Sequence, residues 1–142
     1  MTAAAFLAVS LSACGSGMAL VNNKVEGYAI SEDALAQIRP GQSDKLVLIV
    51  LGSPQTVNTF VSEGETAWYY VETKVSVTAF GLKTINERKV LAIYFDSKMV
   101  VKDKALYSAK DGKVITIESR KTPSYGADRT FLESIIGSFT GS

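Results

Sequence analysis

The run Ala67-Trp68-Tyr69-Tyr70-Val71 is the strongest β-strand signal in the chain, since three consecutive aromatic residues precede a β-branched one. Successive side chains of a strand point to opposite faces, so Tyr69 is expected to face away from Trp68 and Tyr70. We therefore expect at least one of these two faces to fill the core of a sheet.

Strand patterns continue on both sides of this run. Residues 55–60 are rich in Thr and Val, and residues 74–84 alternate loosely around Gly81, which we expect at a bulge or a loop apex. Residues 89–95 alternate regularly and lead through a turn into residues 99–101, the returning strand of a hairpin. We interpret this region as a three-stranded antiparallel sheet.

Two short helices are expected ahead of the strands. In the first, Ser31 is an N-cap that precedes two acidic residues, and Pro40-Gly41 ends the helix. In the second, Ser43 is the N-cap and Gly52 supplies the stop. The β-branched residues among 47–50 favour a strand as the alternative, but the signals at both ends favour a helix.

The last forty residues or so form an extension. Residues 114–117 are a candidate edge strand, and residues 121–126 have the composition of an exposed linker. A capping box begins at Thr130, and apolar residues follow it at helical spacing. Two roles are open for this helix: packing back on its own domain, or docking to a partner or to lipid. The fold class predicted is α+β, with two short N-terminal helices packed on a three-stranded antiparallel sheet and a C-terminal extension ending in a short helix.

The first twenty-three residues carry no charge and contain the only cysteine, Cys14. An apolar stretch closed by small residues is typical of a secretory signal, and Leu11-Ser12-Ala13-Cys14 resembles the lipobox of bacterial lipoproteins. Basic residues are missing at the start, which we interpret as a start codon placed too late. The segment is too short to span a bilayer. The alternative is a disordered or core-packed N-terminus with an inert thiol.

Composition excludes several classes of site. The formal net charge is +1, so the basic footprint of a nucleic-acid-binding protein is missing. With no histidine and one cysteine, a monomer can form neither a Cys/His zinc site nor a Ser-His-Asp or Cys-His catalytic centre. The acidic residues are scattered among lysines, without the contrasting environments that catalytic carboxylate pairs need. We therefore predict no enzymatic activity, no cofactor and no metal.

Several short motifs, in order and with similar spacing, resemble the BamE family, also called SmpA/OmlA. The likeness covers roughly residues 27–105 together with the lipobox. The residues that carry it are Gly27-Tyr28, Gln37-Ile38-Arg39 with Gly41, Leu51-Gly52 with Pro54, Phe60, and Trp68-Tyr69-Tyr70-Val71. Members of this family are small lipoproteins of the β-barrel assembly (BAM) machine in Gram-negative outer membranes.

This resemblance implies a non-catalytic subunit, anchored by lipid at Cys14 to the periplasmic face of the outer membrane. Implied partners are the TPR-containing lipoprotein and the barrel-forming subunit of the BAM complex, with anionic phospholipid such as phosphatidylglycerol as a further ligand. The partner- or lipid-binding residues carried over are Tyr28, Ile38, Arg39, Phe60, Trp68 and Tyr70. The expected divisions are a signal peptide (1–13), a lipidated tether (14–26), the BamE-like domain (27–107) and the extension (108–142).

Other interpretations stand beside these. Arg39 is suited to a phosphate or a carboxylate, or equally to the end of a solvated helix. Tyr28 is suited to packing on the first helix, and the aromatic strand to filling a core. For the whole chain, the alternatives are an inhibitor-like module and a peptidoglycan-associated envelope-integrity lipoprotein, because a fold does not fix a function.

Overall fold

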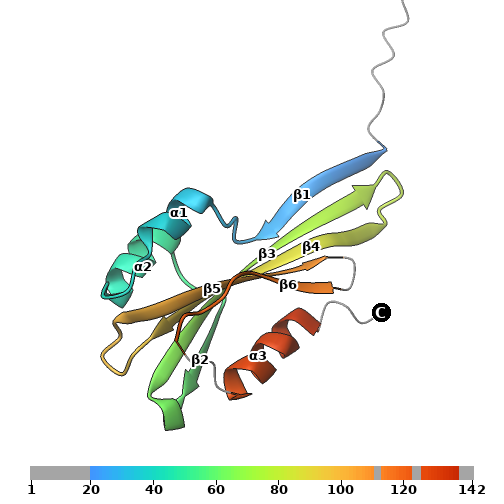
Figure 1. Ribbon diagram of the computed structural model, residues 1–142. Helices are drawn as coiled ribbons and strands as arrows, with labels where there is room; N and C mark the ends of the chain where they lie inside the picture. Colours follow the sequence, from blue (N-terminus) through green and yellow to red (C-terminus); the bar gives the residue numbers. More distant parts are fainter. Residues whose placement is uncertain (1–19, 111–112, 123–125, 138–142) are drawn as a thin grey trace, which may run out of the picture.

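The computed structural model describes residues 20–110, 113–122 and 126–137, and its centre is a six-stranded antiparallel sheet with the order β1-β3-β4-β5-β6 (Figure 1). The sixth strand, β2, also pairs with β3. The strands are β1 (Val21–Gly27), β2 (Thr56–Phe60), β3 (Glu65–Thr78), β4 (Lys83–Phe95), β5 (Val101–Lys110) and β6 (Lys113–Glu118).

The prediction of a three-stranded sheet is therefore wrong, although the α+β class is confirmed. Strand β1 lies in the segment interpreted as a tether, and it pairs with β3 from Val21 opposite Thr78 to Gly27 opposite Glu72. Nearly all of its residues are exposed, so its sequence carries no apolar pattern that would predict a strand. Backbone hydrogen bonds to β3 hold it in the sheet. Strand β6 is also exposed along most of its length.

The two faces of the sheet carry two separate cores. Trp68 and Tyr70 of β3 point to one face, while Tyr69 points to the other, as the alternation predicts. Strand β4 divides in the same way. Its residues Leu91, Ile93 and Phe95 belong to the first core, and Val90, Ala92 and Tyr94 belong to the second.

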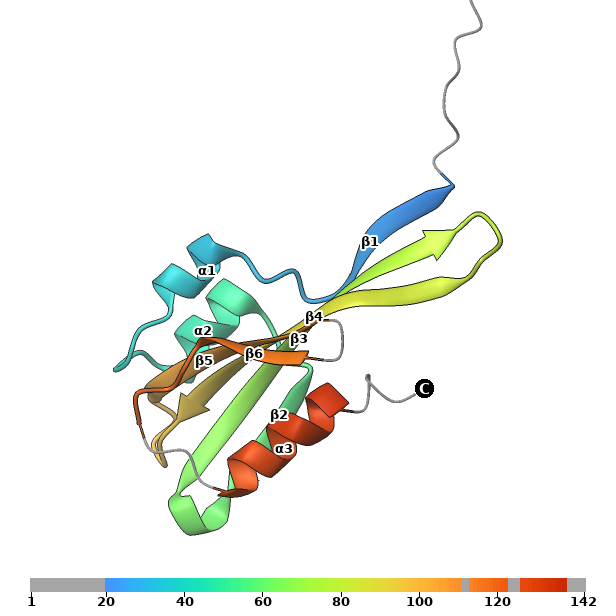
Figure 2. The same ribbon diagram turned by 45° about the vertical axis from the view of Figure 1, so that its right-hand side comes forward.

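Two short helices cover the first core (Figure 2). The N-caps are confirmed: the Ser31 side chain accepts a hydrogen bond at the start of α1 (Glu32–Gln37), and the Ser43 side chain does so at the start of α2 (Asp44–Leu51). The second helix ends at Gly52, which has a φ of +77°. Thus the helical interpretation of this region is correct, despite its β-branched residues.

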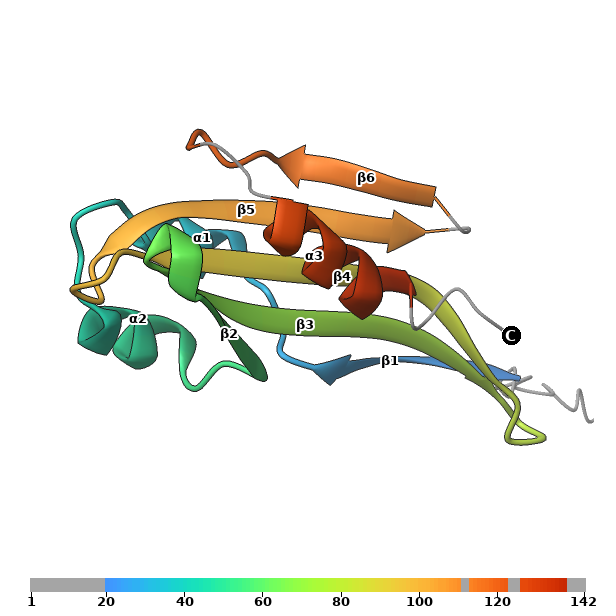
Figure 3. The same cartoon turned by 90° about the horizontal axis from the view of Figure 1, so that it is seen from below.

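Helix α3 (Gly126–Gly137) lies on the opposite face of the sheet (Figure 3). Its Leu132 and Ile136 are 5% exposed and join the second core, where the Phe131 ring lies 5.0 Å from the Tyr69 ring. The helix begins before Thr130, so the expected capping box does not mark its start. Of the two roles left open for this helix, the structure has it packing back on its own domain.

Candidate interaction surface

A shallow groove of about 410 Å³ lies between α1 and α2 on the outer side of the first core. Gln42 shapes it, because its side chain accepts a hydrogen bond from the Arg39 backbone N–H at 2.8 Å and donates one to the Gln37 carbonyl at 2.9 Å. The lining residues are Ala36, Gln37, Arg39, Gln42, Leu46 and Val50.

The groove combines a cationic group with apolar neighbours. Arg39 is exposed at its rim. Leu46 and Val50 of α2 supply apolar side chains to the groove wall. Outside the groove, the same helix exposes Ile49 (80%) and Leu48 (40%) to solvent. A guanidinium can bind a carboxylate or a phosphate through paired hydrogen bonds, and apolar side chains nearby can bury an uncharged part of the same partner. We call this set the groove surface: Arg39, Leu46, Leu48, Ile49 and Val50.

The structure separates the residues carried over from the family resemblance into two groups. Four of them are core residues: Ile38, Phe60, Trp68 and Tyr70, none more than 7% exposed. These four residues shape the surface mainly from beneath, because little of each is exposed to solvent. The other two, Tyr28 and Arg39, reach the surface. Cys14 lies outside the described residues.

Tyr28 connects the segment before α1 to the first core. Its ring lies 5.1 Å from the ring of Tyr70, and its backbone N–H donates to the Val71 carbonyl at 2.9 Å. Burial raises the pKa of Tyr28, and burial together with the nearby Tyr28 phenol raises the pKa of Tyr70 further. The Tyr70 hydroxyl donates to the Gly52 carbonyl at 2.9 Å, so the aromatic strand also fixes the end of α2.

Sequence reasoning missed two polar residues that hold this region in place. The Glu72 carboxylate accepts a hydrogen bond from the Ile30 backbone N–H at 2.6 Å, in front of α1. The Gln55 side chain pairs with both backbone groups of Val71. The sequence gives one signal of the role of Glu72: in a strand, residue 72 lies on the same face as Trp68 and Tyr70. This signal can be used only if β3 is known to continue past Val71.

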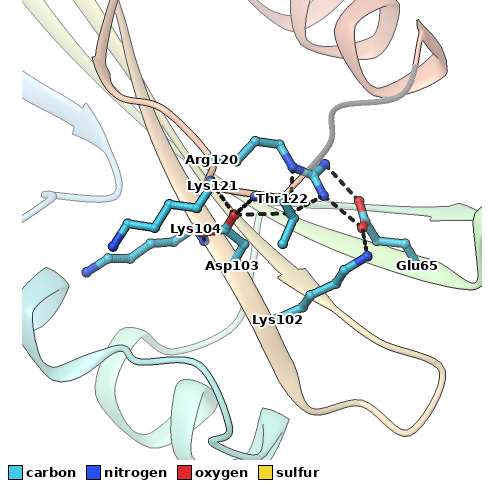
Figure 4. Close-up of polar contacts among 7 residues, drawn as sticks. All are labelled: Glu65, Lys102, Asp103, Lys104, Arg120, Lys121 and Thr122. Atoms are coloured by element: carbon cyan, nitrogen blue, oxygen red, sulfur yellow. Dashed lines mark hydrogen bonds and ion pairs between the residues drawn. The ribbon is translucent and has the colours of Figure 1, made fainter.

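A second polar cluster lies near the other core and ties the extension to the domain (Figure 4). Glu65 is 1% exposed, and its carboxylate accepts two hydrogen bonds from Arg120, at 2.9 and 2.8 Å. Lys102 adds an ion pair at 3.1 Å. The Arg120 guanidinium also sits over the Tyr94 ring, 3.9 Å from its centroid. We call Glu65, Lys102 and Arg120 the Glu65 cluster.

Asp103 holds the residues that follow Arg120. Its carboxylate accepts hydrogen bonds from the backbone N–H groups of Lys121 and Thr122, at 2.6 and 2.7 Å, and from the Thr122 hydroxyl at 3.0 Å. Burial raises the pKa of Asp103, but these donors and the Lys104 backbone N–H outweigh it and hold the pKa below its usual value. Lys121 and Thr122 were expected in an exposed linker, whereas the structure anchors their backbone.

Neither a membrane span nor a metal centre emerges from the part of the chain that the structure describes. Among these residues no helix has both the length and the apolar character needed to cross a bilayer. Within the same ranges, no three His, Cys, Asp or Glu side chains gather in a way that could hold a metal ion.

Comparison with known proteins identifies the unit that carries the groove surface. The family model described as the outer membrane protein assembly factor BamE domain matches residues 27–105, more than half of the chain. This range runs from the end of β1 into β5, and it includes α1, α2 and the aromatic strand. No curated protein matched the chain. The matched range contains the motifs noted in the sequence, the two capped helices and the aromatic strand behind them. The chain belongs to the BamE family of outer membrane protein assembly factors.

Proposed function

We propose that this protein is a non-catalytic lipoprotein subunit of the BAM complex, held at the periplasmic face of the outer membrane by a lipid on Cys14. The observation that carries the proposal is the family match over residues 27–105, which contains the whole groove surface. The lipobox-like run before Cys14 supports the anchor. Several acyl chains on one protein would hold it in the membrane essentially permanently, because each buried CH₂ group contributes about 0.8 kcal/mol.

The partner-binding site is the groove surface. The TPR-containing lipoprotein of the complex binds there through an acidic side chain that pairs with Arg39 and apolar side chains that cover Ile49. Charge-assisted pairs of this kind are directional, and exposed apolar residues on α2 supply area that water otherwise covers. Tyr28 and the buried residues Ile38, Trp68 and Tyr70 act by positioning α1 and α2. Phe60 belongs to the core on the other face of the sheet.

Anchoring lowers the affinity that each contact must supply. Two proteins held on one membrane meet at a high effective concentration, so a weak groove contact persists when both partners are anchored. Anionic phospholipid such as phosphatidylglycerol is a further proposed ligand of the protein, through a cationic side chain that pairs with the lipid phosphate.

A detergent-solubilised pull-down tests both parts of the proposal. Wild type is expected to recover the TPR lipoprotein and the barrel-forming subunit. Cys14→Ser is expected to keep its fold but to leave the membrane fraction and recover less of both. Unchanged recovery from cells would contradict the role of the anchor.

The groove surface is tested by a charge reversal with a matched control. Arg39→Glu is expected to lower recovery of the TPR lipoprotein by about tenfold or more, since a like charge replaces an attractive one. Arg129→Glu makes the same change at an exposed position of α3, on the other face of the sheet, and is expected to bind as wild type does. Equal losses in the two variants would show that net charge matters and the groove does not.

A further inference from the structure

One end of the sheet carries a group of exposed apolar side chains, away from the groove surface and from α3. Strands β1, β3 and β4 extend together beyond the rest of the sheet, and we call this extension the arm (Figures 1 and 2). The β3–β4 turn and the start of β1 lie at its end. Phe80 in this turn is 92% exposed and Leu82 is 68% exposed. Leu20 is 67% exposed, and its carbonyl accepts a hydrogen bond from the Ala79 N–H at 2.9 Å. We call Leu20, Phe80 and Leu82 the apolar tip.

The tip is presented by a closed turn. The backbone N–H groups of Thr78 and Gly81 donate to the carbonyls of Leu82 and Thr78, each at 2.9 Å, and the Leu82 N–H donates to the Thr78 hydroxyl at 3.1 Å. Gly81 has a φ of +81°, which lets the chain reverse sharply. The N–H groups of four of these turn residues, Thr78, Ala79, Gly81 and Leu82, are paired, which lowers the cost of moving the turn out of water relative to an open loop.

Charged residues stand behind the tip and are paired with one another. Glu26 lies between Lys24, at 3.0 Å, and Lys83, at 2.5 Å. The hydrogen bonds from Lys83 and Lys24 hold the pKa of Glu26 below its usual range. The end of the arm therefore exposes apolar side chains first and paired charges, with one positive charge in excess, next. A protein that touches a bilayer meets apolar and charged environments in the same order.

The length of the preceding chain connects the tip to the membrane. Cys14 is six residues before Leu20, so even a fully extended backbone places the two within about 20 Å of each other. A lipid on Cys14 would hold the tip within that distance of the bilayer surface. The intervening residues carry no charge that would oppose a closer approach.

We infer that the apolar tip inserts Phe80 and Leu82 into the interfacial region of the bilayer that holds the anchor. The inference rests on the proposed lipid anchor and adds a second, noncovalent membrane contact to it. Apolar side chains at the headgroup boundary bury area without spanning the membrane. An isolated exposed Leu is ordinary on a protein surface, but an aromatic and two leucines together at the point where the anchor segment joins the sheet are not.

Two contacts fix an orientation, whereas a single anchor leaves the domain free to rotate. With the tip on the bilayer, the opposite end of the sheet points away from the membrane. That opposite end carries the Asp96–Met99 turn and the segment around Gln42, whose carbonyl accepts a hydrogen bond from the Val101 N–H. The groove surface would then face the periplasm, where anchored partners can reach it.

Tryptophan fluorescence in the full-length lipidated protein measures this contact directly. The protein is reconstituted in vesicles of phosphatidylethanolamine and phosphatidylglycerol with brominated acyl chains as quencher. In Phe80→Trp, the new indole is expected to shift to shorter wavelength and to be quenched. In Ser97→Trp, the new indole sits in an exposed turn at the other end of β4 and is expected to show neither effect. Equal quenching of both indoles, or of neither, would overturn the inference.

A partition assay without the anchor provides the second readout. In a Cys14→Ser background, replacing both Phe80 and Leu82 by Ser is expected to weaken binding to the same vesicles about tenfold or more. Replacing Val57 and Val61 by Ser removes exposed apolar side chains from β2 and the short turn after it, and is expected to leave vesicle binding unchanged. The inference would be overturned if the two double substitutions weakened vesicle binding equally. It would also be overturned if the Phe80 and Leu82 substitutions reduced binding to a protein partner but left vesicle binding unchanged.

Failure of the tip and failure of the proposed function give different results. Suppose that the Phe80→Trp protein carries the lipid on Cys14 by mass and recovers the BAM subunits, but that its new indole is not quenched. This result contradicts the tip alone. An unmodified Cys14 thiol contradicts the anchor, and in that case vesicle binding by the unanchored chain decides whether the tip acts by itself.

Discussion

At the scale of single residues, Gly27 tolerates a side chain least among the glycines with a positive φ within the described ranges. Its φ is +81°, and an added Cβ would collide with the Val71 carbonyl oxygen and come within 2.8 Å of the Gln55 amide nitrogen. We expect Gly27→Ala to lower the free energy of unfolding by about 2–4 kcal/mol, because left-handed strain and displaced backbone add together. Urea denaturation monitored by Trp68 fluorescence measures this change.

Gly81 is the matched control for this prediction. It has the same φ of +81°, but nothing lies within 4 Å of the position of an added Cβ. Gly81→Ala is therefore expected to cost only the left-handed strain, about 1–2 kcal/mol. A loss for Gly27→Ala no larger than that for Gly81→Ala would show that the close approach to Val71 does not matter.

Residue types predicted some of the side-chain positions and not others. Alternation placed Trp68 and Tyr70 opposite Tyr69 correctly, because it needs only the two-residue period of a strand. It could not tell which aromatic residues reach the surface, because α1 and α2 cover one face and α3 covers the other. Motif similarity named Arg39, but its exposure at a groove depends on how α1 meets α2.

At the scale of elements, the Glu65 cluster is the link between the extension and the sheet. Arg120→Met is expected to lower the free energy of unfolding by about 3 kcal/mol, because it leaves the buried Glu65 carboxylate with a single partially exposed partner. Native-state hydrogen exchange should show faster exchange in β6 and α3 than in β3. Chemical denaturation measures the total change in the free energy of unfolding.

Lys102→Met is the control within the same cluster. Its side chain is 32% exposed, so the ion pair with Glu65 is partly screened by solvent. We expect a loss below about 1 kcal/mol and no change in the hydrogen exchange of α3. Equal losses for the two variants would show that Arg120 is no more important than an ordinary surface partner.

The attachment of the extension should also weaken in acid. The pKa of folded Asp103 lies below its unfolded value of 3.8, so the unfolded chain binds a proton more readily. The stabilisation from Asp103 is therefore complete above pH 3.8 and is lost as the pH falls through the lower folded pKa. Thermal melting of Asp103→Asn across this range is expected to depend less on pH than that of wild type. Parallel profiles would contradict a role for Asp103 in acid sensitivity.

Elements with a buried face were predictable from the sequence, and the exposed strand β6 was expected as an edge strand over residues 114–117, whereas the exposed strand β1 was not expected. Strands β3 and β4 and helices α1 and α2 carry apolar residues at regular spacing or caps at their ends. Strand β1 carries neither, because its partner β3 supplies the hydrogen bonds that make it a strand. Counting strands from apolar patterns therefore gave too few of them.

At the scale of the whole molecule, β3 and β4 supply side chains to both cores, so the two faces of the sheet cannot lose order independently. Ile136→Ala is expected to lower the free energy of unfolding by about 2–4 kcal/mol, because it opens a cavity under α3. Trp68 lies on the opposite face, yet its fluorescence should report the same lowered urea midpoint as circular dichroism. Glu133→Ala, at an exposed position of α3, is the control and should leave both midpoints unchanged. A separate early transition in circular dichroism, with the Trp68 transition unmoved, would mean that α3 docks as an independent unit and that the sheet does not couple its two faces.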